Sequence, residues 1–144
     1  MRRNHRCRRL RCALGPGYGQ RLYLRRHRHC RSGSTASMDP GPSMSIYGGT
    51  KAAVRNMVRS WVAELKGTGI RINIVSPGPT NTDSLREAFG DNADEGLAFL
   101  TAKSPLGRIG EPEEIASVVA FLASDSASYV NGVELFADGG ASQT

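Results

Sequence analysis

An amphipathic helix followed at once by a short apolar strand is the feature that most constrains the fold of this chain. Within residues 47–65 the apolar positions recur every three or four residues, which is typical of a helix with one buried face. Residues 70–78 ("IRINIVSPG") then alternate isoleucines with other residues and end in Pro77 and Gly78, as a short strand does. A strand that follows a helix so closely predicts the alternating α/β architecture of a parallel sheet.

The rest of the body continues this alternation. Residues 79–107 suggest two short helices, the first capped by Thr82 or Asp83, in a long connection of the kind that often forms a lid. Residues 112–124 predict another amphipathic helix, and residues 133–140 a strand that runs into a glycine turn. These elements amount to the back portion of a doubly wound parallel sheet, so we expect an incomplete, truncated domain.

The first 31 residues differ sharply from this body. They contain eleven arginines and all the histidines and cysteines, but no lysine and no acid, so they carry +11 whereas residues 32–144 carry −5. A segment of that composition cannot bury enough apolar surface to offset its ordering entropy. We therefore divide the chain into an Arg-rich segment, residues 1–31, expected to be disordered or read out of frame, and a folded body, residues 32–144.

Other interpretations of the Arg-rich segment stay open. Its guanidinium groups could bind the phosphates of a nucleic acid, although basic tails bind polyanions whether or not biology uses them. A transit peptide is opposed by the helix-breaking "GPGYG", and these glycines lack the flanking strand and helix of a dinucleotide loop. Four zinc-type ligands occur at loose spacing with few apolar residues around them, so no metal site is assigned: Cys7, Cys12, His27 and Cys30.

The sequence contains no long apolar run of the kind that spans a membrane, and no apolar segment behind a charged start. Neither a membrane anchor nor a secretory signal is predicted, so the expected location is the cytoplasm.

A tyrosine and a lysine stand four residues apart near the start of the long helix, in "SIYGGTKAAV". Positions i and i+4 share a helix face, so Tyr47 and Lys51 are expected to project side by side. An ammonium near a phenol favours the phenolate, which suits a proton donor and acceptor at neutral pH. The spacing alone is common on helix surfaces and does not settle the matter.

The context of the pair is more specific. Ser34 stands thirteen residues before Tyr47 in "SGSTAS", and "INIVSPGPTNT", "GRIGEPEEIASVVAFLASD" and "GVELFADGG" follow in order. Together these motifs closely resemble the carboxyl-terminal half of the short-chain dehydrogenase/reductase (SDR) family, in register over residues 32–144. The resemblance implies a Rossmann-like fold and an oxidoreductase that moves hydride between NAD or NADP and a small carbonyl or alcohol substrate.

The resemblance also implies a role for individual residues. Tyr47 exchanges a proton with the substrate oxygen, Lys51 assists it and binds the nicotinamide ribose, and Ser34 holds the substrate oxygen. The family's "PGxxxT" turn, which lies against the nicotinamide, matches Pro77, Gly78 and Thr82. Residues 79–104 correspond to the variable substrate lid, so the substrate is not specified.

Several features of the family do not occur in residues 1–33: the glycine-rich cofactor loop, the residue that selects NAD or NADP, the Asn-Ala-Gly segment and a catalytic asparagine. We therefore expect this chain alone to bind dinucleotide poorly and to be inactive. Gly48 and Gly49 are expected to loosen the first turn of their helix. One alternative is a non-catalytic module that pairs with itself or a full-length relative through its two long helices, and another is an Arg-rich arm for nucleic acid.

Overall fold

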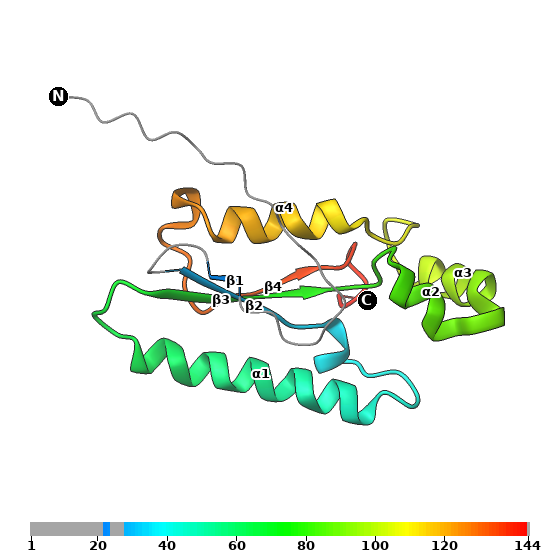
Figure 1. Ribbon diagram of the computed structural model, residues 1–144, viewed down its shortest axis with the longest axis horizontal. Coiled ribbons are helices and arrows are strands. Elements are labelled where there is room, and N and C mark those ends of the chain that lie inside the picture. Colours follow the sequence, from blue (N-terminus) through cyan, green and yellow to red (C-terminus); the bar gives the residue numbers. More distant parts are fainter. Residues whose placement is uncertain (1–21, 24–27, 144) are drawn as a thin grey trace.

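A four-stranded sheet forms the centre of the molecule in the computed structural model, which describes residues 22–23 and 28–143 (Figure 1). The strands lie in sequence order, and β1 is antiparallel to β2, whereas β2, β3 and β4 run parallel. Their bounds are Leu22–Tyr23 (β1), Arg28–Ser32 (β2), Arg71–Pro77 (β3) and Glu134–Ala137 (β4).

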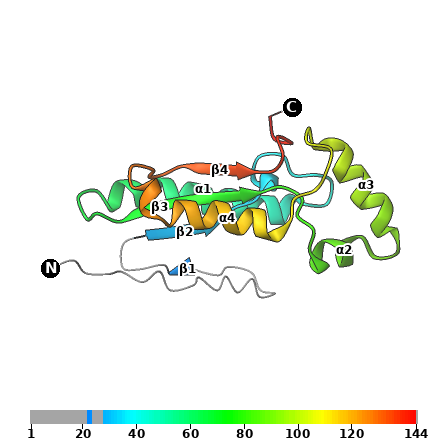
Figure 2. The same cartoon turned by 90° about the horizontal axis from the view of Figure 1, so that it is seen from above.

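Helices cover both faces of this sheet. The long helix α1 (Ser45–Glu64) lies on one face and α4 (Pro112–Leu122) on the other, while α2 (Asp83–Phe89) and α3 (Ala93–Lys103) extend beyond the end of β3 (Figures 1 and 2). Short 3-10 turns occur at Thr35–Ser37 (η1), Gly90–Asn92 (η2) and Asp125–Ala127 (η3). The predicted α/β fold with a parallel sheet is confirmed.

Strand β3 is the core of the sheet because both of its faces are buried. Ile72 and Ile74 pack with Val58 beneath α1, and Val75 packs with Leu122 beneath α4. This pattern fits a parallel strand with a helix over each face. The alternating isoleucines predicted the strand, and the structure adds that Asn73, which lies between Ile72 and Ile74, is also buried.

The structure places part of the Arg-rich segment in the sheet, which corrects the predicted boundary between residues 31 and 32. That boundary falls inside β2, whose backbone pairs with β3 from Arg28 to Ser32. Cys30 is only 7 % exposed and packs in the core with Val75 and Leu122. Composition misled here because an arginine can join a strand when its long side chain reaches a suitable partner, as Arg31 does by lying over the ring of Trp61.

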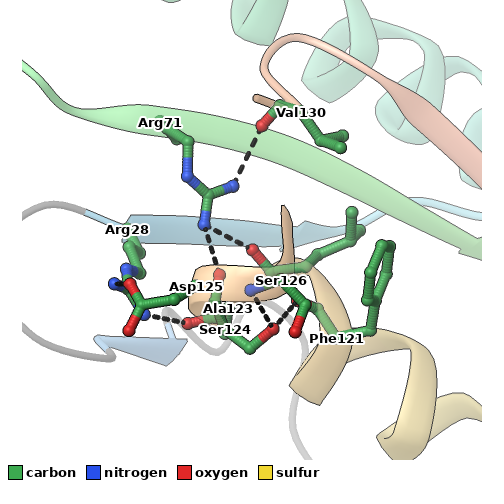
Figure 3. Close-up of polar contacts among 9 residues, drawn as sticks. Arg28, Arg71, Phe121, Ala123, Ser124, Asp125, Ser126 and Val130 are labelled. Atoms are coloured by element: carbon green, nitrogen blue, oxygen red, sulfur yellow. Dashed lines mark hydrogen bonds and ion pairs between the residues drawn. The ribbon is translucent and has the colours of Figure 1, made fainter. Parts of the chain in front are cut away.

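Two arginines close the end of the sheet where the parallel strands begin (Figure 3). Arg71 donates to the carbonyl oxygens of Val130, Leu122 and Ser124 at 2.9, 2.9 and 3.1 Å. Arg28 donates to the carbonyl of Ala123 at 2.8 Å and pairs with the carboxylate of Asp125. Guanidinium groups thus satisfy the carbonyls that α4 leaves unpaired at its carboxyl end.

Most of the other interpretations of the Arg-rich segment lie outside the described residues, including its predicted disorder over residues 1–21 and 24–27 and the candidate ligands Cys7, Cys12 and His27. Of those ligands the structure describes Cys30, where burial raises the pKa of the thiol to about 11 although a backbone hydrogen bond with Val75 lowers it. No group of three or more metal-type ligands gathers among the described residues. None of the helices in this part of the chain is both long and apolar enough to cross a membrane.

Candidate functional site

The candidate site lies at the carboxyl ends of β2 and β3, where the chain leaves the sheet. Gly33 follows β2 directly, and its N–H donates to the carbonyl of Val75 at 2.7 Å. A Cβ on Gly33 would lie 2.2 Å from the hydroxyl oxygen of Ser76, so only glycine allows the two strands to approach this closely. This contact carries the chain into Ser34.

Ser34 caps the short turn η1. Its hydroxyl oxygen accepts a hydrogen bond from the N–H of Ala36 at 3.2 Å, and its backbone is extended, as at a helix N-cap. The hydroxyl proton is not used in this bond, so Ser34 can still donate to a ligand. The turn places Ser34 next to the start of α1, because η1 and α1 pack against each other.

Gly48 makes the contact between η1 and α1 possible. A Cβ at this position would lie 2.6 Å from the carbonyl oxygen of Ala36 and 2.9 Å from Pro40. Helix α1 therefore runs without interruption from Ser45 through both glycines, and the loosening of its first turn stays a prediction. Gly48 serves close packing, whereas a Cβ on Gly49 would meet nothing within 4 Å.

Tyr47 and Lys51 lie together on this first part of α1. The ammonium of Lys51 lies 5.6 Å from the centre of the Tyr47 ring, and its Nζ donates to the carbonyl of Ser32 at 3.4 Å. That second contact ties the helix to the end of β2, two residues before Ser34. Within the described part of the chain, the hydroxyl of Tyr47 has no hydrogen-bond partner, so it can receive one from a ligand.

The predicted turn after β3 lies at the same end of the sheet. Gly78 donates its N–H to the carbonyl of Ala137, and a Cβ on it would lie 2.6 Å from the Cβ of Asp138. Thr82 is the N-cap of α2, because its hydroxyl oxygen accepts from the N–H of Leu85 at 3.2 Å. Of the two caps that the sequence suggested, the structure uses Thr82.

Asp138 is held by its own loop. Burial by itself would raise the pKa of this carboxyl group, but hydrogen bonds from Ser142 and from the backbone N–H groups of Gly140 and Ser142 bring the pKa below its usual value. The carboxylate therefore stays charged and fixes the glycine turn that follows β4.

Residues 79–104, which sequence analysis predicted to be a lid, are attached near their start to the segment that precedes α4. Asn81 donates its N–H to the carbonyl of Gly110 at 2.8 Å, and its side-chain amide donates to the Glu111 carboxylate at 3.2 Å. Close by, Arg108 pairs with Glu114 at 2.7 Å. The predicted lid thus has a fixed base, while α2 and α3 extend away from the sheet (Figure 2).

Sequence analysis missed a partly buried polar cluster beneath these residues. Glu134 on β4 accepts from the hydroxyl of Ser76, and it also contacts Ser37 in η1 and Arg55 in α1. An acid inside the apolar stretch "VELFA", and an arginine one helical turn after Lys51, were the signals that could have revealed it.

Comparison with known proteins agrees with this architecture. Residues 30–142 match the sequence model of the family described as enoyl-(acyl carrier protein) reductase. The chain is 41% identical over 112 residues to the oxidoreductase asL5 of Sarocladium schorii, which covers 78% of this chain and 44% of that protein. It is 42% identical over 114 residues to the 2,3-dihydro-2,3-dihydroxybenzoate dehydrogenase of Escherichia coli strain K12, covering 74% and 46% of the two chains.

Among solved structures, the aldohexose dehydrogenase of Thermoplasma acidophilum superposes with a TM-score of 0.76 at 29% identity, over 81% of this chain and 48% of that one. The chain spans less than half the length of each of these three relatives. The matched region includes β2 from Cys30 onward, β3, β4 and the helices between them, which are the elements that form the candidate site. On the family match and these identities, the chain belongs to the short-chain dehydrogenase/reductase family.

Proposed function

We propose that this chain carries the catalytic corner of an NAD(P)-dependent oxidoreductase that exchanges hydride with a small carbonyl or alcohol substrate. The observation that supports this most is the meeting of Tyr47, Lys51 and the η1 turn after Ser34 at one end of the sheet. The side chains of Ser34, Tyr47 and Lys51 each keep hydrogen-bonding capacity for a ligand. Family membership supplies the class of reaction, and the substrate within that class is left open.

The described residues fit one end of a nicotinamide dinucleotide. Lys51 and Tyr47 offer a cation and a phenol for the ribose, and the turn of Pro77, Gly78 and Thr82 offers backbone groups and a hydroxyl. For the pyrophosphate the fit fails, because no strand in residues 28–143 leads through a turn with several glycines into a helix. We therefore propose that this chain alone holds NAD or NADP weakly.

Each side chain has one task in this proposal. The nicotinamide, when bound, supplies or accepts the hydride. The hydroxyl of Tyr47 donates a proton to the substrate oxygen during reduction and takes it back during oxidation, and the ammonium of Lys51 favours the charged phenolate that remains. The hydroxyl of Ser34 donates a hydrogen bond to the same oxygen and so orients the substrate.

Binding of cofactor fragments tests the proposal directly. NADH and reduced nicotinamide mononucleotide should bind the purified chain with similar, weak affinity, since the adenosine half finds no cradle among the described residues. Lys51→Ala should weaken both, and the exposed Lys66→Ala should weaken neither. Micromolar binding of NADH alone would show that the dinucleotide cradle is present after all, and equal binding to the wild type and Lys51→Ala would refute the assigned corner.

Hydride transfer is the second test. The chain is mixed with NADH or NADPH and a panel of aldehydes and ketones, and the loss of reduced cofactor is followed by absorbance. Any turnover should fall by about 10²–10⁴-fold in Tyr47→Phe, the usual contribution of a positioned proton donor. Turnover that survives this substitution unchanged would remove Tyr47 from the mechanism.

Self-association is a second candidate function, and the outer face of α1 favours it. Ile46 is 83 % exposed and Met57 43 % exposed on this helix, and Phe121 is exposed on α4. Because α1 and α4 lie on opposite faces of the sheet, these side chains form two separate surfaces, and the one on α1 is the candidate for pairing with another protein. Sedimentation should show a dimer that Ile46→Glu and Met57→Glu dissociate, whereas a monomer at every concentration tested would exclude this candidate.

A further inference from the structure

A partly buried carboxylate beneath the candidate site contacts β3, η1 and α1, three of the elements that position the site's residues. Glu134 on β4 accepts a hydrogen bond from Ser76 on β3, with 2.7 Å between the two oxygens. The same carboxylate oxygen lies 3.5 Å from the hydroxyl of Ser37 in η1. Its second oxygen lies 3.8 Å from Nε of Arg55 in α1.

The partners of Glu134 are close in sequence to the site residues. Ser37 stands one turn after Ser34, and Ser76 comes directly before Pro77. Arg55 lies one helical turn after Lys51, on the same face of α1. A displacement of the Glu134 carboxylate would therefore first change the distance between η1 and α1.

Burial makes these contacts strong enough to matter. The side chain of Glu134 is 14 % exposed and that of Arg55 25 % exposed, so the charges are less screened than a surface pair. The separation of 3.8 Å marks the Arg55 contact as ionic, whereas the bond from Ser76 has the length of a charge-assisted hydrogen bond. Loss of these partners would leave a partly buried carboxylate without hydrogen-bond donors, which is unfavourable, so the three elements are held around it.

We propose that Glu134 is a positioning residue, which fixes the distance between Ser34 on η1 and the Tyr47–Lys51 pair on α1. Its importance for catalysis rests on the proposed function, but the positioning itself does not. Glu134 acts through Ser37 and Arg55 and touches no reacting group.

Asp138 provides a matched control for this proposal. It directly follows β4, whereas Glu134 begins that strand, and its carboxylate is also partly buried. Within the described residues, Asp138 accepts hydrogen bonds only from its own loop, at Gly140 and Ser142. A change there alters the end of the strand without reaching η1 or α1.

Hydrogen exchange on the full chain, without cofactor, tests the proposal. Glu134→Ala should raise exchange about tenfold in η1 and in the first half of α1, the effect of losing a hydrogen bond to a charged group, while α4 stays unchanged. Glu134→Gln keeps an acceptor for Ser76 and Ser37 but not the charge. Exchange in η1 should therefore stay at the wild-type rate, and exchange should rise only in α1. Arg55→Leu should act like Glu134→Gln, and Asp138→Asn should affect neither element.

A spectroscopic signature separates positioning from general stability. The ¹⁵N resonance of the Lys51 ammonium, whose Nζ donates to Ser32, should shift in Glu134→Ala and stay in place in Asp138→Asn. Exchange that rises equally in α4, or an unchanged η1 in Glu134→Ala, would overturn the proposal. If Glu134→Ala does not fold, Glu134→Gln and Arg55→Leu decide it, because protection of α1 that stays at the wild-type level in both contradicts the proposed contact. These outcomes need no turnover, so they stand apart from the Tyr47→Phe test of the proposed function.

Discussion

The two ends of the parallel sheet use their polar groups in opposite ways. Where the strands begin, the guanidinium groups of Arg28 and Arg71 are occupied by carbonyl oxygens and by Asp125 (Figure 3). Where the strands end, the hydroxyl of Tyr47 has no partner among the described residues, and Lys51 makes a single long hydrogen bond. An end whose donors are already occupied maintains the fold, whereas an end with spare donors can bind a ligand.

The size of the surface depressions does not identify the same end of the sheet as the candidate site. A depression of about 870 Å³ opens at the beginning of the strands, lined by Lys66 and Tyr129 together with Arg28 and Arg71. The two arginines are already engaged there, and burial together with the neighbouring Arg28 lowers the pKa of Arg71. We give spare hydrogen-bonding capacity more weight than volume, because specific recognition depends on a few well-placed polar groups.

The largest expected effect on stability concerns Arg71. Arg71→Ala removes the donor of the Leu122 carbonyl and one of the two donors of the Val130 and Ser124 carbonyls, so the free energy of unfolding should fall by about 2–3 kcal/mol. Urea denaturation measures the change, with the exposed Arg59→Ala as control within about 0.5 kcal/mol of the wild type. Equal stabilities of the two variants would contradict the claim that the arginines where the strands begin maintain the fold.

The two neighbouring glycines of α1 should respond with opposite signs. Gly48→Ala forces a methyl group against the carbonyl of Ala36, so it should destabilise the protein by about 1–3 kcal/mol. Gly49→Ala meets open space in a helix and should stabilise it by about 0.5–1 kcal/mol. Thermal unfolding of both variants tests the packing of η1 on α1, which the same sign for both would disprove.

Loss of the Tyr47 hydroxyl, at the end of the sheet where the candidate site lies, should leave stability nearly unchanged. Tyr47→Phe removes a hydroxyl that has no partner in the described part of the chain, so the free energy of unfolding should change by less than about 0.5 kcal/mol. Binding and hydride transfer should suffer instead, as proposed above. A loss of stability as large as that of Arg71→Ala would mean that Tyr47 is a structural residue.

The smallest effect is a pH dependence at the start of α4. The hydrogen bonds from Arg108 and from the N–H of Glu111 lower the pKa of Glu114 from its ordinary 4.5 to about 2. A lowered carboxyl pKa adds stability that is fully present above 4.5 and is lost as the pH falls through about 2. Because Glu114 is exposed, the effect should be small, and it should disappear in Glu114→Gln when unfolding is followed across this pH range.

Local signals in the sequence predicted most of the body. The apolar stripe located α1 within two residues of its ends, and Pro112 with its neighbouring acids located the start of α4, where the structure shows a capping box. The Tyr-x3-Lys spacing placed two side chains on one helix face, because the rise of a helix is the same in every protein. These features depend on residues close together in the chain.

Contacts between distant residues decided the remainder. Composition assigned Arg28 to a disordered segment, but its guanidinium reaches acceptors about a hundred residues further along the chain. Gly48 was expected to weaken a helix, and the close approach of the Ala36 carbonyl explains why a glycine stands at this position. Glu134 gathers Ser37, Ser76 and Arg55 from three other elements.

The sequence by itself therefore determined the family, the order of the elements and the face on which Tyr47 and Lys51 lie. Only the tertiary structure decided that β2 begins inside the Arg-rich segment and that a carboxylate on the last strand meets the elements of the site. The physical reason is that periodicity and capping are set by neighbours along the chain. The partner of a partly buried charge, in contrast, is set by which segments the folded sheet brings together.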